Sequence, residues 1–292
     1  PRLPVLDSPD SQTSRFPRLP QSSQTSSLPR LPRFPRDPRL QDVQDFYSVV
    51  NPHIVTFYIH SNIDRERLIT IIEKYFSNWK KTNSIKRPRY TYNSLRGVKS
   101  IFIDNPSLDQ STIYITKWSE PKYRKDHYAI DLANHIIGGS FHSRINRRLR
   151  INGGKTYGAE SYHLRMSDVG RVATTTSTRT SETMNTLLLI IDEMGRAGNF
   201  GVTQEEIFKA KKYLSGSVPL DLEYPSSMIN RILSMDFYGK IYNGPSGISN
   251  DIKHVPIYDV NVAAMEYYGP KDFVLTIVGN YSEVSKQIIL LD

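Results

Sequence analysis

The sequence predicts an α+β fold in which a mainly antiparallel sheet is packed with helices. Two kinds of segment carry this prediction: short runs of apolar or alternating residues typical of strands, and longer runs with apolar residues at helical spacing. They come in blocks rather than in strict alternation, which favours α+β over a parallel α/β sheet. The 292 residues, 38% of them hydrophobic, are enough for one large or two medium domains.

Residues 1–40 form a separate segment that is rich in Pro, Arg, Ser and Gln and holds nine of the 18 prolines. Within it, two sets of residues recur at every third position: Pro29, Pro32, Pro35 and Pro38, and Arg30, Arg33, Arg36 and Arg39. A polyproline II helix would place the two sets on different edges. Three interpretations stay open: a docking peptide for an aromatic groove, a disordered tail, or a DNA repeat translated in the wrong frame. No fold is assigned to this segment.

Residues 41–80 read as globular sequence. Ile54–Ile59 is predicted to be a strand, and the run Ser61-Asn62-Ile63-Asp64 to start a helix. That helix has one apolar face, made by Leu68, Ile72, Tyr75, Phe76 and Trp79. Residues 81–97 are predicted to be a linker, since they are rich in Lys, Asn, Pro and Gly.

Residues 98–292 are predicted to form a second and complete unit. Its expected strands are Ser100–Asp104, Thr112–Trp118, Thr156–Leu164, Arg171–Thr178 and Phe273–Gly279. Its expected helices are Asp126–Ile137, His142–Ile151, Thr183–Met194, one opened by the capping box Thr203-x-x-Glu206 and running to about Leu214, Pro225–Tyr238, Ile257–Tyr268 and one from Tyr281 onward. The strand-turn-helix of Ile54–Trp79 is echoed by Phe273–Leu291, which indicates two homologous domains with the first cut short.

Charge and composition exclude several classes of function. The net charge of +9 divides into +4 on residues 1–40 and +5 on the rest, and no basic stripe with interleaved aromatics is present, so we expect no nucleic-acid binding. No segment approaches the length of apolar sequence that a membrane span needs. The absence of cysteine excludes disulfides, thiolate zinc sites and cysteine nucleophiles. The chain begins with Pro rather than Met, so the start shown is expected not to be the natural one.

The stretch from Gly138 to Tyr157 is the most informative part of the chain. It places Arg150 and Tyr157 seven positions apart, across a predicted helix end and the Gly153-Gly154 turn. A guanidinium and a phenol brought together in this way suit contacts to a peptide carbonyl and stabilisation of an oxyanion. Arg150 and Tyr157 are therefore the candidate catalytic residues.

This stretch, with the later Pro219-Leu220-Asp221-Leu222-Glu223, resembles the C-terminal domain of the insulinase/pitrilysin-type zinc peptidases, the inverzincins. The resemblance runs from about Gln41 to Asp292. It implies that residues 41–80 are the C-terminal remnant of a first peptidase-like domain and 98–292 a complete C-terminal domain. It also implies a peptide or protein substrate and, by analogy, a bacterial periplasm or cell envelope.

The resemblance further implies that the two halves of such an enzyme supply different parts of the active site. The N-terminal half of such an enzyme holds zinc through H-x-x-E-H, and the C-terminal half supplies the Arg and Tyr that correspond here to Arg150 and Tyr157. H-x-x-E-H is absent from this sequence, so zinc is expected in a partner half and the chain alone is expected to be inactive. Two departures from the family pattern, Ile151 where an acidic residue is common and Lys155 where an apolar one is usual, keep a non-catalytic binding or scaffold subunit open.

Other catalytic and metal-binding classes are disfavoured by spacing. The seven histidines show neither H-x-x-E-H nor H-x₃-H, so we interpret them as structural or surface residues. Ser140 and Ser143 lie near His142 without a Gly-x-Ser-x-Gly elbow, which disfavours a serine hydrolase. The glycine pairs lack the G-x-x-x-x-G-K-[ST] phosphate-binding pattern and are predicted to stop helices.

Overall fold

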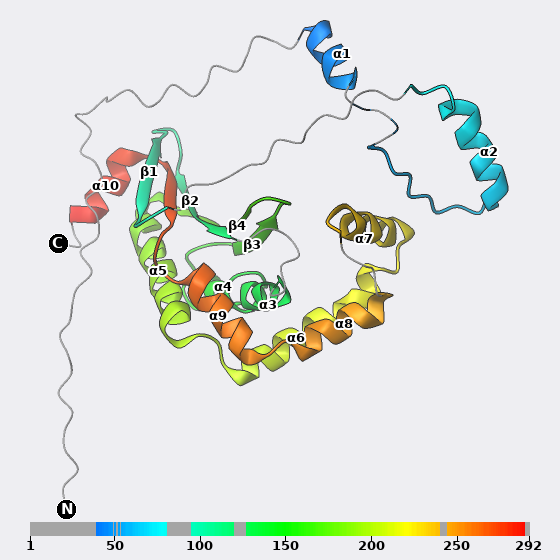
Figure 1. Ribbon diagram of the computed structural model, residues 1–292. Helices are drawn as coiled ribbons and strands as arrows, with labels where there is room; N and C mark the ends of the chain where they lie inside the picture. The colour runs from blue at the N-terminus through cyan, green and yellow to red at the C-terminus, as the bar shows by residue number, and fades with distance from the viewer. Residues whose placement is uncertain are drawn as a thin grey trace, which may run out of the picture. The chain divides into compact units, whose positions relative to one another are not determined.

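The computed structural model describes residues 39–48, 50, 52, 54–80, 95–119, 127–239 and 244–289. The predicted tail at residues 1–38 and most of the predicted linker, residues 81–94, lie outside this part of the chain. The elements follow one another as Figure 1 labels them. The strands are β1 (Lys99–Asp104), β2 (Gln110–Ser119), β3 (Ala159–Arg165), β4 (Gly170–Arg179) and β5 (Val274–Gly279).

The helices account for most of the remaining described residues. They are α1 (Leu40–Ser48), α2 (Arg65–Phe76), α3 (His127–Ile137), α4 (Arg144–Asn146), the π-helical turn η1 (Arg147–Ile151), the 3₁₀ turn η2 (Thr180–Glu182), α5 (Thr183–Phe200), α6 (Gln204–Asp221), α7 (Pro225–Phe237), α8 (Gly244–His254), α9 (Ile257–Tyr268) and α10 (Tyr281–Ile289).

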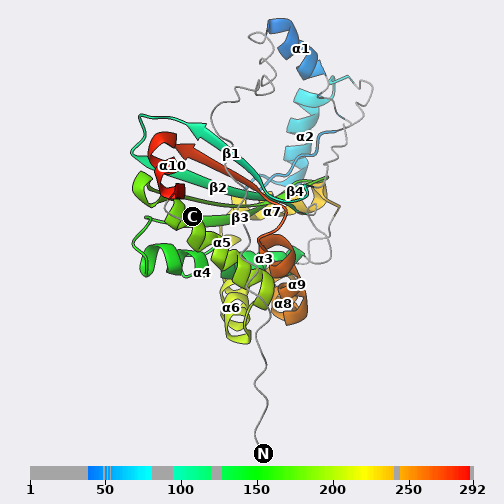
Figure 2. The ribbon, with the colours of Figure 1, turned by 90° about the vertical axis from the view of Figure 1, so that its left-hand side faces the viewer.

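The strands form one five-stranded sheet in the order β1-β5-β2-β4-β3. β1 and β5 run parallel and every other neighbouring pair is antiparallel, so the predicted class, α+β with a mainly antiparallel sheet, is confirmed. Helices α3, α5 and α9 lie on one side of the sheet (Figure 2). β3 is an edge strand, and this position decides what its residues can contact.

The core lies between the sheet and its helices. Strand residues that alternate along the chain point to the helix side and are buried, as for Ile113 and Ile115 of β2 and Leu275 and Ile277 of β5. They meet the apolar faces of the helices, including Leu132 and Ile137 of α3, Ile190 of α5 and Ala264 of α9. The alternate residues of the same two strands are partly buried or exposed, so the described core lies on the helix side of the sheet.

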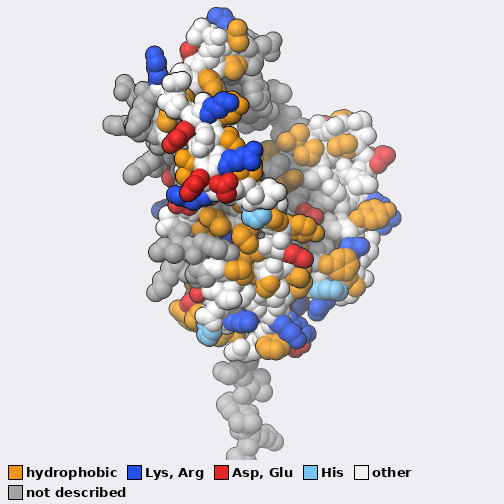
Figure 3. All heavy atoms as spheres, turned by 90° about the vertical axis from the view of Figure 1, so that its right-hand side faces the viewer, with side chains coloured by type: hydrophobic (Ala, Val, Ile, Leu, Met, Phe, Trp, Pro, Cys, Tyr) orange, Lys and Arg blue, Asp and Glu red, His pale blue; other side chains and the backbone are white. Residues whose placement is uncertain are grey.

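The surface carries exposed hydrophobic side chains, among them Phe208, Tyr213 and Leu220 of α6. On the face shown in Figure 3, hydrophobic side chains lie among charged ones. Among the described helices, none combines the length and the apolar character that a transmembrane segment requires.

Several element predictions need correction. Ile54–Ile59 is not a strand, because no described segment pairs with it and a lone extended segment is not stable as a strand. α5 continues past Gly195 to Phe200, since glycine weakens a helix by only about 1 kcal/mol and packing outweighs that cost. α6 likewise runs through Pro219 to Asp221. α8 was missed, because its Gly-Pro-Ser-Gly start is typical of a loop.

Candidate functional site

The candidate site is built on α4 and η1, where the sequence predicts one short helix. Ser143 caps α4, its hydroxyl oxygen accepting from the backbone N–H of Asn146 at 3.4 Å. The next five residues form a π-helical turn, a conformation often found at functional sites. Ile145 and Leu149 are buried in the core, which leaves Arg150 exposed on the other side.

The Gly153-Gly154 pair ends this helical segment, as predicted. Gly154 has a φ of +55°, which a glycine adopts without steric cost. The backbone N–H of Lys155 then donates to the Leu149 carbonyl at 2.8 Å, turning the chain back along the helix. Two residues later the chain reaches Tyr157, just before β3. This turn lets the Arg150 and Tyr157 positions, seven residues apart, border the same pocket.

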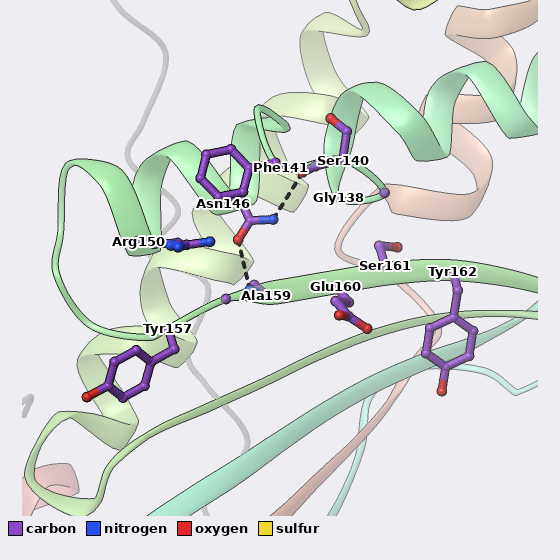
Figure 4. A pocket seen from close by; sticks show the side chains of 12 residues that line it. Gly138, Ser140, Phe141, Asn146, Arg150, Tyr157, Ala159, Glu160, Ser161 and Tyr162 are labelled. Carbon is purple, nitrogen blue, oxygen red and sulfur yellow. Dashed lines mark hydrogen bonds between the residues drawn. The ribbon is translucent and has the colours of Figure 1, made fainter. Parts of the chain in front are cut away.

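Arg150 and Tyr157 line the same pocket, which has a volume of about 400 Å³. Its walls come from three segments, namely the Gly138–Phe141 turn after α3, the α4–η1 segment, and residues 157–162 at the start of β3 (Figure 4). The structure therefore brings together the two residues that the sequence singled out. Phe141, Asn146 and Glu160 also line the pocket, and sequence reasoning had not selected them.

The side chains of Arg150 and Tyr157 have donors that no other described residue uses. The Arg150 guanidinium lies 4.4 Å from the centroid of the Phe141 ring, a cation–π contact that orients it. Arg150 forms no ion pair with any other described residue. Tyr157 is 91% exposed, and its hydroxyl makes no hydrogen bond within the described part of the chain.

The Asn146 side chain bridges two walls of the pocket. Its Nδ2 donates to the Ser140 carbonyl at 3.0 Å, and its Oδ1 accepts from the Ala159 N–H at 2.8 Å (Figure 4). Asn146 is 7% exposed, so both bonds are made in a largely water-free environment. It thereby fastens the Phe141 turn to the strand that follows Tyr157. The local sequence shows only an asparagine among the apolar positions Ile145 and Leu149, and its two partners lie on other segments.

The outer edge of β3 is already occupied where it borders the pocket. The Ser161 N–H donates to the Gly138 carbonyl at 3.0 Å, and Asn134 Nδ2 donates to the Ser161 carbonyl at 3.1 Å. A Cβ at position 138 would overlap that of Ser161, so glycine is required for this close approach. A peptide cannot add as a further strand at Ala159–Ser161.

Ion pairs hold the α4–η1 segment against the neighbouring helices. Arg144 Nε and Nη2 donate to the two Glu206 carboxylate oxygens at 2.7 and 2.6 Å. Arg148 pairs with Glu193 at 3.3 Å and with Asp192 at 2.5 Å. Arg144 and Arg148 thus form ion pairs with carboxylates of α5 and α6. Arg150 forms no such ion pair with a described residue.

The ion pair with Arg144 affects the pKa of the Glu206 carboxyl. Burial favours the neutral acid, but hydrogen bonds from Arg144 and Thr203 outweigh it and lower the pKa of the Glu206 carboxyl to about 2. Thr203 and Glu206 also form the predicted capping box at the start of α6. The Glu206 carboxylate therefore both caps the start of α6 and binds Arg144 of α4.

The two departures from the expected family pattern have different surroundings. Lys155 Nζ donates to Glu182 at 2.8 Å, and this hydrogen bond lowers the pKa of the Glu182 carboxyl. Ile151 is exposed at the end of η1. Lys155 is therefore held by an ion pair, whereas Ile151 presents an apolar side chain where a charge was expected.

A metal site is absent from the described residues, where no three His, Cys, Asp or Glu side chains converge. Several histidines have structural contacts, such as His163 Nε2 with the Ser119 hydroxyl at 2.7 Å and the His135 ring stacked on Tyr213. His53 lies outside the described residues. The donor set that zinc requires is not offered by the described residues.

Comparison with known proteins identifies the class. Residues 39–214 match the family model described as the peptidase M16 inactive domain. The match covers more than half of the chain, and the chain belongs to this insulinase/pitrilysin-type metallopeptidase family. The resemblance inferred from the Gly138–Tyr157 stretch is thereby confirmed.

Relatives differ in the activity that their names state. An uncharacterized zinc protease of Bacillus subtilis, YmxG, is 22% identical over 81% of this chain and 56% of its own length. A protein of Helicobacter pylori described as a non-peptidase homolog is 28% identical over 50% of this chain and 34% of its own length. The chain thus spans little more than half of the first relative and about a third of the second.

The fold is also shared with a solved structure. The first half of the periplasmic protease PqqL from Escherichia coli superimposes with a TM-score of 0.65 at 13% identity, covering 85% of this chain and 56% of that one. At this identity the likeness establishes the fold. It is PqqL that is periplasmic; the location expected for this chain stays a prediction.

We predict that Asn146→Ala destabilises the protein by about 2–3 kcal/mol, because it leaves the buried Ala159 N–H without its acceptor and removes a bond to Ser140. Urea unfolding measures the loss. Asn152→Ala, at an exposed position on the same segment, is the matched control and should cost little. Asn146→Asp keeps the acceptor and should recover part of the loss. Equal stability of the Asn146→Ala and Asn152→Ala variants would contradict the bridge.

We predict that Glu206 makes stability depend on pH in acid. Its folded-state pKa of about 2 lies below the ordinary value of 4.5, so the stabilisation is complete above 4.5 and is lost as the pH falls towards 2. Since the side chain is 30% exposed, we expect about 1–2 kcal/mol after allowing for solvent screening.

Unfolding titrations of wild type and Glu206→Gln across this range test the prediction. The variant should lose stability at neutral pH and show a flatter acid profile. Glu223→Gln, at an exposed position just beyond α6, should follow the wild type. An unchanged acid profile in Glu206→Gln would show that this carboxylate is not the group responsible.

Proposed function

We propose that this chain acts as the C-terminal, zinc-free half of a zinc-dependent endopeptidase. The observation that carries the proposal is the pocket shared by Arg150 and Tyr157, each with donors that no other described residue uses. Both donors suit a carbonyl oxygen that gains negative charge during peptide cleavage. The active centre would be completed by a zinc-bearing N-terminal half or subunit of the same family, and the substrate would be a peptide or protein.

In this proposal the residues of the chain have separate roles. Arg150, oriented by the Phe141 ring, supplies a fixed positive charge to a substrate carbonyl. The Tyr157 hydroxyl donates a hydrogen bond to the same region, and its exposure leaves it accessible to a substrate held by the opposite half. Zinc, held by the partner half, supplies the activated water. The occupied edge of β3 at Ala159 and Ser161 is not available for a peptide to add as a strand there.

The domain organisation is part of the proposal. Residues 98–292 would be the complete C-terminal domain and 41–80 the end of a first domain, with 81–97 as the linker and 1–40 as a tail. α2, capped by Asp64, has no buried residue, which fits a helix that lacks the rest of its domain. A periplasmic or envelope location is proposed by analogy with the periplasmic protease PqqL.

A non-catalytic subunit is the second candidate. The Helicobacter pylori relative is described as a non-peptidase homolog, and Ile151 replaces an expected acidic residue here. In that case the chain would pair with a zinc-bearing partner as a binding or scaffold subunit. The two candidates differ in whether Arg150 and Tyr157 affect turnover.

We predict that, in an enzyme assembled with a zinc-bearing half, Tyr157→Phe and Arg150→Ala each lower kcat/KM by about 100-fold, or about 3 kcal/mol, because each removes one transition-state donor. Steady-state cleavage of a fluorogenic peptide measures this. Arg147→Ala and Tyr258→Phe, both exposed and outside the pocket, are the controls. Stable pairing with unchanged turnover in both pocket variants would favour the scaffold subunit instead.

A further inference from the structure

Two threonines of β4 approach the segment that carries Tyr157. Thr176 and Thr178 lie on the helix side of the sheet and are only 4% and 2% exposed. The Thr178 hydroxyl donates to the Lys155 carbonyl at 2.7 Å. The Thr176 hydroxyl lies 2.9 Å from the Gly158 carbonyl oxygen. The chain on either side of Tyr157 is thus held by buried hydroxyls of a single strand.

A third hydroxyl closes a short turn at Tyr157. Thr156 Oγ1 accepts from the Gly158 N–H at 3.1 Å, a bond of the kind that Ser and Thr side chains make in turns. The same oxygen lies 3.0 Å from the Thr176 hydroxyl. Tyr157 is the middle residue of this turn, where the chain bends. Its backbone is therefore enclosed by hydroxyl contacts, while its side chain remains 91% exposed.

Regular strand pairing does not reach Tyr157. The register between β3 and β4 ends at Ala159 and Thr176, so Tyr157 lies two residues beyond the last pair. The bond between Thr178 and Lys155 is made where the segment has already left the sheet. Backbone groups outside a ladder must find other partners when they are removed from water. Here the threonine hydroxyls supply such partners.

The hydroxyl contacts are supported from neighbouring elements. The Thr186 hydroxyl of α5 donates to Thr178 Oγ1 at 3.2 Å, which leaves the Thr178 proton for the Lys155 carbonyl. Lys155 is also held through its N–H by the Leu149 carbonyl and through its ammonium group by Glu182. A buried polar network whose members are satisfied in this way makes the local structure rigid.

We infer that Thr176 and Thr178 are positioning residues for Tyr157. Neither threonine lines the pocket, and both act through the backbone of residues 155–158. The inference rests on the proposed function, because only that function gives Tyr157 a part in turnover. Since a misplacement of about 1 Å can cost about 100-fold in rate, loss of one hydroxyl slows turnover although the phenol is still present.

Amide hydrogen exchange of the chain itself tests whether the hydroxyls hold this segment. Thr176→Val should accelerate exchange at the Gly158 N–H about tenfold, because the turn opens more often, and Thr176→Ser should restore the wild-type rate. Thr178→Val gives a second reading, at the Lys155 N–H. Thr174→Val is the matched control, since Thr174 is similarly buried on the same strand but its hydroxyl donates to the Ser161 hydroxyl instead. Exchange that is no faster in the Thr176→Val and Thr178→Val variants than in Thr174→Val would overturn the inference.

A double-mutant cycle in the assembled enzyme tests whether the effect on turnover passes through Tyr157. Thr176→Val should lower kcat/KM about tenfold in the wild type but less than about twofold in a Tyr157→Phe background, where the positioned hydroxyl is already gone. A general loss of stability would act equally in both backgrounds. Equal losses in kcat/KM would therefore overturn the inference and keep the proposed function. Unchanged turnover in both Tyr157→Phe and Arg150→Ala would instead overturn the proposed function, and the inference with it.

Discussion

The geometry of the site depends on the hydrogen bonds that fasten the outer edge of β3 to the segment between α3 and η1. Gly138, Asn134 and Asn146 each contribute a bond to Ala159 or Ser161. These bonds set the separation between the turn that carries Phe141 and the chain that carries Tyr157. They also occupy the backbone groups of Ala159 and Ser161 at the edge of the sheet, so these groups cannot pair with a further strand.

Four arginines in seven residues, at positions 144, 147, 148 and 150, illustrate how packing assigns different roles to one residue type. Arg144 and Arg148 face α5 and α6, where carboxylates neutralise them. Arg150 faces the pocket, where an aromatic ring orients the guanidinium without neutralising it. A charge that is fixed in position but not paired can still interact with a ligand. The ion pairs on the inner side of the segment hold the backbone that presents this charge.

Membership of the peptidase M16 family and the half-length match to its relatives place these features in context. The pocket lies on a domain in whose described residues no group of three or more His, Cys, Asp or Glu side chains could hold a metal ion. The Helicobacter pylori relative is described as a non-peptidase homolog, whereas the Bacillus subtilis relative is described as a zinc protease.

The sequence by itself determined the fold class and most elements, because periodicity, glycine stops and the capping box at Thr203 are local signals. It also singled out Arg150 and Tyr157, which line one pocket in the structure. It also showed that H-x-x-E-H is absent. It could not determine the fate of Ile54–Ile59, since a strand exists only when another pairs with it. The roles of Phe141 and Asn146 came only from the tertiary structure. Their partners lie on other segments, and whether a polar side chain is buried, stacked or unpaired depends on contacts that local sequence does not encode.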